Sequence, residues 1–157
     1  MFFERQQGRR CGLHAVHNLL RSADISSADM DAAAAWCAGS SEDVVRNHRS
    51  SAGDWSMDTL RRVLSERGYD VKRAVAVRTT GVRWDVAPMS ELLEDENVVG
   101  FILQSKDHYA CLRKEGAGWH FCDSLRPVPV PLEARAFCTE CLYERCNAFL
   151  VRRHAPT

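Results

Sequence analysis

The sequence has no excess of charge of either sign and no long apolar run. Lysine and arginine together number 21, and so do aspartate and glutamate, so no overall field attracts nucleic acid or an anionic membrane. No apolar stretch approaches the roughly 20 residues of a membrane span, and the N-terminus has no apolar secretory signal. We therefore expect no nucleic-acid partner and no membrane span. We also expect an intracellular, cytoplasmic protein, in its own cell or in a host cell that receives it.

The cysteines do not form the pattern of a disulfide framework or of a zinc site. Their number, seven, is odd and their spacing is irregular, which favours reduced thiols. Cys138 and Cys141 make one C-x-x-C, but structural zinc needs a second pair, and His154 in a polar tail is a poor substitute. The region around them is better explained as the apolar side of a helix. We expect no metal and no cofactor.

The order of the secondary structure predicts one α+β domain over residues 1–153, with a short tail at 154–157. Helical spacing and serine caps predict helices that start at Cys11, near Ser26 and after Ser56. Residues 40–55 are polar and indicate a connection with at most a turn or two of helix. Short helices are expected after Pro88 and over 132–144, and strands over 71–77, 98–103, 108–113, 118–123 and 148–151. This pattern predicts N-terminal helices packed on a mostly antiparallel sheet.

Cys11 lies where a polar lead-in meets an amphipathic helix. Leu13, Val16, Leu19 and Leu20 repeat at the spacing of one helix face. Backbone N–H groups and the helix dipole at an N-terminus favour an anion, so a cysteine there is a candidate nucleophile. The alternative is a buried structural cysteine, which is a common fate of free cysteine.

A predicted hairpin brings a histidine and a carboxylate together. If Glu115 and Gly116 form a two-residue turn, His108 lies directly opposite Asp123, with the two Cβ atoms about 5 Å apart. A four-residue turn would shift the register by two and keep both side chains on one face. A three-residue turn would put them on opposite faces.

A carboxylate on one imidazole nitrogen leaves the other free to take a proton from a thiol, so Cys11, His108 and Asp123 form a candidate triad. His14 and His17 lie on the Cys11 helix, and we expect them to pack or to hold backbone groups near the site. Acyl transfer also needs an oxyanion donor. Gln6 and Gln7 both lie close enough in the chain, and the pattern does not separate them.

Three stretches of the sequence resemble the Josephin domain, a family of papain-like cysteine proteases that remove ubiquitin. They are ERQQGRRCGLHAVHNLL at 4–20, DHYACLRK at 107–114 and GWHFCDSL at 118–125. The order and spacing of the helices and strands expected between them are similar too, so the resemblance covers nearly the whole chain, and it is closest to the short, single-domain Josephin proteins. The resemblance implies a papain-like fold and one Josephin-like catalytic domain.

The resemblance also implies the role of each site residue. Cys11 would be the nucleophile, His108 the general base and then acid, Asp123 the group that orients it, and Gln6 the oxyanion donor. Two departures stand out: His17 replaces the first of two adjacent asparagines, and the 40–55 connection is short. Neither affects the triad.

By the same resemblance, the expected reaction is hydrolysis after the C-terminal glycine of ubiquitin, and the expected partners of a monomeric enzyme are ubiquitin, polyubiquitin chains and ubiquitinated proteins. Met57 and Asp58 match positions that contact ubiquitin in the family, and Trp55 and Trp119 could line the channel for its tail. Core packing is the alternative for Met57 and both tryptophans. The alternative functions are a non-catalytic ubiquitin-binding module, a papain-like hydrolase or transferase for another Gly-ended modifier, and a small zinc-bearing adaptor.

Overall fold

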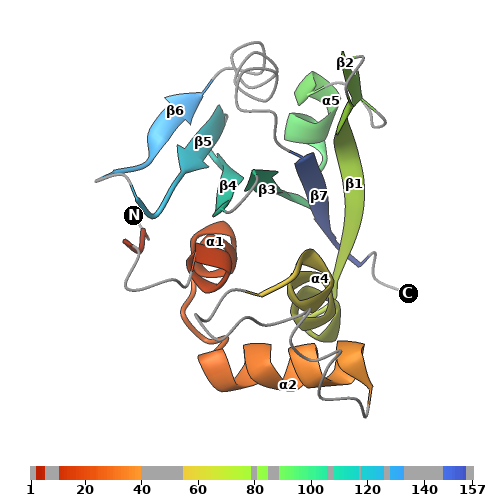
Figure 1. The fold of residues 1–157 in the computed structure, drawn as a ribbon. Coiled ribbons are helices and arrows are strands. Elements are labelled where there is room, and N and C mark those ends of the chain that lie inside the picture. Colours follow the sequence, from red (N-terminus) through yellow and green to blue (C-terminus); the bar gives the residue numbers. More distant parts are fainter. Residues whose placement is uncertain are drawn as a thin grey trace.

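The computed structural model describes residues 3–5, 11–39, 55–78, 81–84, 89–105, 108–116, 118–125, 128–132 and 147–154. In chain order the elements in Figure 1 are α1 (Cys11–Leu20), α2 (Ser27–Ala38), α4 (Met57–Glu66), β1 (Tyr69–Arg78), β2 (Gly81–Trp84), α5 (Met89–Glu94), β3 (Val98–Ser105), β4 (His108–Glu115), β5 (Gly118–Cys122), β6 (Val130–Leu132) and β7 (Asn147–Arg153). None of the helices in these ranges has the length and apolar character that crossing a bilayer requires.

The strands form one seven-stranded sheet in the order β2-β1-β7-β3-β4-β5-β6. Every neighbouring pair is antiparallel. The last strand of the chain, β7, lies between β1 and β3, so the C-terminal segment completes the middle of the sheet. The predicted α+β arrangement of helices packed on a mostly antiparallel sheet is confirmed.

Serine caps start two of the helices, as the sequence predicted. The Ser26 hydroxyl accepts from Asp29 N at 3.1 Å, and the Asp29 carboxylate accepts from Ser26 N at 2.8 Å, which is a complete capping box at α2. Ser56 caps α4 by accepting from Thr59 N at 3.2 Å. These local bonds define where each helix begins.

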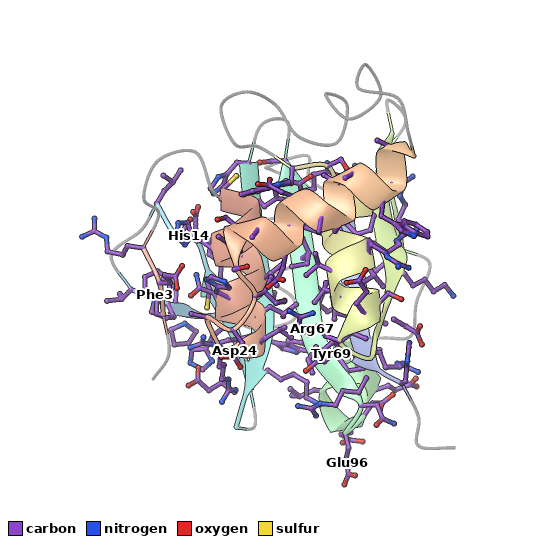
Figure 2. All side chains as sticks on the ribbon, turned by 90° about the horizontal axis from the view of Figure 1, so that it is seen from below. Phe3, His14, Asp24, Arg67, Tyr69 and Glu96 are labelled. Atoms are coloured by element: carbon purple, nitrogen blue, oxygen red, sulfur yellow. The ribbon has the colours of Figure 1, made fainter. Side chains whose placement is uncertain are left out.

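The sheet is buried on both faces. On one face α1 and α4 contribute to a core that includes Val16, Leu60 and Ile102, and α2 lies outside them (Figures 1 and 2). On the other face Leu92 of α5 packs in a second core with Phe101 and Leu112, among others. Side chains therefore alternate between two cores along β3.

The α1 helix is more buried than an amphipathic pattern predicts. Every residue from Cys11 to Leu19 is buried, the polar ones included. Glu4 contacts the polar side of α1, and so does the backbone of Ile25. The apolar spacing of α1 did not predict that other segments would cover this polar side.

Two strands were not predicted. They are β2 and β6, the two edges of the sheet. The predicted helix over 132–144 was wrong at its first residue, because Leu132 belongs to β6. Pro131 lies in that edge strand, where one side of the backbone needs no ladder partner. The rest of this helix and residues 40–54 of the predicted connection lie outside the described residues.

The described cysteines are free thiols, as expected.

Gly100 allows two strands to approach closely. Its φ is +151°, and it lies where the register between β3 and β7 shifts. An added Cβ would stand 2.1 Å from the carbonyl oxygen of Leu112 on β4. Since that oxygen belongs to the backbone, it cannot rotate away, and only glycine fits.

We predict that Gly100→Ala lowers the free energy of unfolding by about 3 kcal/mol, because it adds both a strained φ and a backbone clash. Gly118→Ala is the matched control: it lies in β5 with open space around its Cβ position, and it should change stability by less than about 0.5 kcal/mol. Chemical denaturation of both variants measures the difference. Equal midpoints would show that β3 and β4 do not approach as described.

Candidate active site

Cys11 is the first residue of α1, in the position expected of a nucleophile at a helix N-terminus. Its side chain is buried, with 5% of the residue exposed. The next residue, Gly12, lies against α4 and β4: an added Cβ would be 3.3 Å from Leu60 Cδ1 and 3.4 Å from Tyr109 Cδ2. The start of α1 is thus tightly packed against the strand that carries His108.

The hairpin register differs from the predicted one. Glu115, not Lys114, begins the turn and pairs with Gly118, and the ladder then continues to Cys111 opposite Cys122. His108 is therefore not directly opposite Asp123. The shift is two positions, so both side chains stay on one face as diagonal neighbours.

The predicted histidine–carboxylate contact is present despite this shift. His108 Nε2 lies 2.7 Å from Asp123 Oδ1. The same oxygen accepts a hydrogen bond from Leu125 N at 3.0 Å. Asp123 follows the end of β5, so this turn holds its carboxylate in place. The imidazole is thereby oriented by a group that is itself fixed.

His108 is a strong base in this setting. Its hydrogen bond with Asp123 is the largest cause, with a second from the Cys11 side chain, and together they outweigh burial and raise the pKa of His108 to about 9. Because Nε2 faces Asp123, Nδ1 is the nitrogen left for Cys11. The ring can therefore accept a proton from a thiol and deliver it to a leaving group.

Residues 3–5 are held against α1 by Glu4. Glu4 N donates to Asn18 Oδ1 at 2.6 Å, and Asn18 Nδ2 donates to Glu4 O at 3.0 Å. The Glu4 side chain contacts His14 and His17, which are both buried. Burial raises the pKa of Glu4, but the hydrogen bonds with His17 and His14 outweigh it, and the pKa is lowered.

The sequence prediction did not include Glu4. It lies 10 and 13 residues from the two histidines, and no local pattern joins residues so far apart. Gln6 and Gln7 lie outside the described residues, so the oxyanion donor stays a prediction. Since Glu4 is two positions before Gln6, anchoring Glu4 limits where Gln6 can go.

The four predicted substrate-binding residues fall into two groups. Met57 is partly buried beside the helix-side core, and Asp58 is exposed at the start of α4, in a pocket that Trp36 also lines. Trp55 and Trp119 are each only 3% exposed. The structure therefore shows core packing for both tryptophans, and contact of any of the four with ubiquitin stays a prediction.

Comparison with known proteins places the chain in a family. The sequence profile described as Josephin matches residues 6–152. A protein from Oryza sativa subsp. japonica described as an ataxin-3 homolog is 26% identical over 142 residues. The alignment covers 82% of this chain and 42% of that protein, so the chain spans less than half of its length.

Solved structures are also similar to the chain, among them the crystal structure of a double glycine motif protease from an AMS/PCAT transporter in complex with the leader peptide. It is 12% identical, with a TM-score of 0.46 over 98% of this chain and 91% of that one.

We predict that Asp123→Asn lowers the pKa of His108 from about 9 toward its ordinary value near 6.5, because the main cause of the rise is removed. Imidazole NMR titration of the folded protein measures this directly. A histidine with a raised pKa stabilises the folded chain fully below about pH 6.5 and loses that contribution as the pH rises through about 9. The loss of folding stability between about pH 6.5 and 9 should therefore be smaller in Asp123→Asn. An unchanged His108 pKa would contradict the assignment of Asp123.

Proposed function

The chain belongs to the Josephin family, whose members are generally cysteine-protease deubiquitinases, and on that premise we propose that it hydrolyses the bond after the C-terminal glycine of ubiquitin. The observation that supports the proposal most is the position of His108, whose ring is hydrogen-bonded to Asp123 and whose pKa is raised by that bond and by the nearby Cys11 side chain. A nucleophile, a base and a group that orients the base are what acyl transfer requires.

In the first half of the proposed reaction, the Cys11 thiolate attacks the carbonyl carbon of the terminal glycine. The carbonyl electron pair moves to oxygen, and Gln6 is the proposed donor to that oxyanion. When the oxyanion collapses, the C–N bond breaks and protonated His108 gives its proton to the leaving lysine amine. The product is a thioester between Cys11 and ubiquitin.

In the second half, neutral His108 takes a proton from water, and the hydroxide attacks the thioester carbonyl. The carbon–sulfur bond breaks, ubiquitin leaves with a free carboxylate, and Cys11 is again a thiolate beside a protonated ring. Asp123 stays ionised throughout and keeps the ring oriented. We further propose that Met57 and Asp58 contact the folded part of ubiquitin, since they lie together at the start of α4.

The test is reaction of the purified chain with ubiquitin that carries a C-terminal electrophile, read by intact mass. We expect an adduct of one ubiquitin that is absent in Cys11→Ala and at least about a hundredfold slower in His108→Ala, the contribution typical of a general base. Cys37→Ala and His120→Ala are the matched controls. The first removes a thiol and the second an imidazole, each at a position away from the Cys11–His108 pair.

The outcomes separate the alternative functions. Ubiquitin binding without an adduct would favour a non-catalytic binding module. An adduct only with another Gly-ended modifier carrying the same electrophile would favour a different substrate. If the adduct persisted in Cys11→Ala, the proposed nucleophile would be wrong.

We predict that cleavage of an isopeptide-linked ubiquitin slows as the pH rises through about 9, because neutral His108 cannot protonate the leaving amine. In Asp123→Asn the alkaline limit should move to lower pH. Initial rates from pH 6 to 10 measure both profiles. Identical alkaline limits in the two proteins would mean that His108 is not the general acid.

A further inference from the structure

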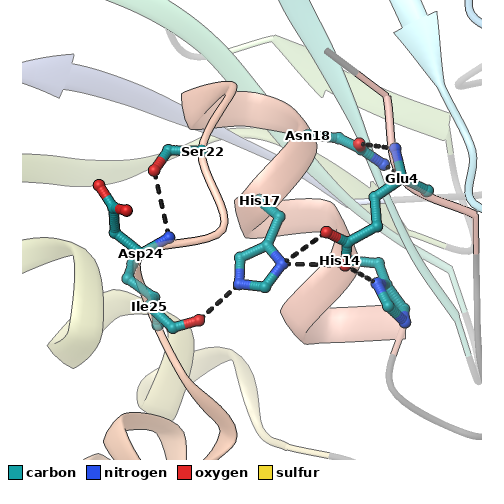
Figure 3. Close-up of polar contacts among 7 residues, drawn as sticks. All are labelled: Glu4, His14, His17, Asn18, Ser22, Asp24 and Ile25. Carbon is teal, nitrogen blue, oxygen red and sulfur yellow. Dashed lines mark hydrogen bonds and ion pairs between the residues drawn. The ribbon is translucent and has the colours of Figure 1, made fainter.

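Three side chains outside the Cys11–His108–Asp123 group converge on one point (Figure 3). A carboxylate oxygen of Glu4 and ring nitrogens of His14 and His17 all lie within 4.8 Å of one another. His17 Nδ1 is 2.9 Å from Glu4 Oε1 and 3.1 Å from Oε2, and His14 Nδ1 contacts the same Oε1. The histidine side chains are 7% exposed, whereas Glu4 is 28% exposed and gives the cluster one open side.

The protons of His17 are constrained by its two neighbours. Its Nε2 lies 2.5 Å from the carbonyl oxygen of Ile25, which can only accept a hydrogen bond, so Nε2 carries hydrogen. A neutral imidazole has one N–H, so Nδ1 then points a lone pair at the Glu4 carboxylate. Two acceptors at this distance repel unless a cation lies with them, either a second proton on His17 or a metal ion.

The donor set is that of a transition-metal site. Two imidazole nitrogens and one carboxylate oxygen are the three protein ligands of one common zinc arrangement, with water as the fourth. A histidine bound to metal almost always donates its other N–H to a carbonyl or carboxylate, as His17 does to Ile25. The two histidines are three residues apart on α1, a spacing that puts both on one side of a helix.

We propose that Glu4, His14 and His17 bind a divalent transition metal, with zinc the preferred ion, through the Glu4 carboxylate and the Nδ1 atoms of both histidines. Tetrahedral zinc with bonds near 2.05 Å puts its ligand atoms about 3.3 Å apart. The contacts between the Glu4 carboxylate and the two histidine nitrogens are somewhat shorter than this, and Glu4 can withdraw because its side is partly open. This departs from the expectation of no metal.

The role that follows is structural. The ion would tie residues 3–5 to the helix that carries Cys11, adding to the two hydrogen bonds between the Glu4 backbone and the Asn18 side chain. It would thereby fix the segment that leads to Gln6. No step of the thiol chemistry passes through it, so the metal site and the proposed hydrolase activity can succeed or fail separately.

The test is zinc binding to the full chain, expressed without a histidine tag, stripped with chelator and titrated after dialysis. A Cys138→Ser, Cys141→Ser background removes the C-x-x-C as a competing site, and Cys11→Ala removes the reactive thiol. We expect one equivalent of zinc and a rise in Tm of roughly 5 °C at saturating zinc. His17→Asn should weaken binding at least roughly tenfold, a loss seen even for supporting residues of metal sites.

His154→Asn is the matched control, because His154 also contacts a carboxylate, that of Asp70, but on the surface and with no third ligand among the residues that the structure describes. It should bind zinc as the parent does. Zinc binding that is absent, or equally strong in His17→Asn, would overturn the proposal and leave a protonated His17 as the cation.

If His17→Asn does not fold, cobalt substitution in the parent decides. Visible bands of a nitrogen- and oxygen-ligated ion would support the site. A thiolate charge-transfer band, or no bands, would refute it.

Discussion

The rest of the structure depends on the burial of α1 from every side. Its apolar residues pack against the sheet, where each fully buried leucine or valine contributes about 2 kcal/mol, while its polar side needs specific partners. Arg113 of β4, fully buried, donates to Asn18 O at 3.0 Å near the end of the helix. A buried guanidinium without partners would cost several kcal/mol, so α1 has little freedom to slide along β4. The position of Cys11 at the other end follows from that constraint.

The proposed reacting groups come from elements that meet only in the folded chain. Cys11 begins α1, His108 begins β4, and Asp123 follows β5. Helix and sheet each supply part of the site, and the close contact of Gly12 with Tyr109 joins the two parts beside the nucleophile. The turn that fixes Asp123 through Leu125 N also fixes the orientation of His108. This preorganisation means that the proposed reaction needs little rearrangement of the site.

The sequence predicted the site better than it predicted the register behind it. Strand alternation predicted that His108 and Asp123 lie on one face of the hairpin, and a register shift of two residues leaves them on that face. The predicted contact is therefore present although the turn was misplaced by one position. The edge strand β6 was missed because its prolines do not resemble a strand, and an edge tolerates them. The Ser26 and Ser56 caps were predicted because each bond joins residues three apart.

The sequence alone thus determined the features that depend on near neighbours: helix starts, strand alternation, and the residue types of a thiol site. Only the tertiary structure decided which distant segments meet. The placement of β7 between β1 and β3, and the meeting of Glu4 with His14 and His17, depend on packing between segments far apart in the chain. No residue spacing records such meetings, because their free energy comes from surfaces that exist only once both segments have folded.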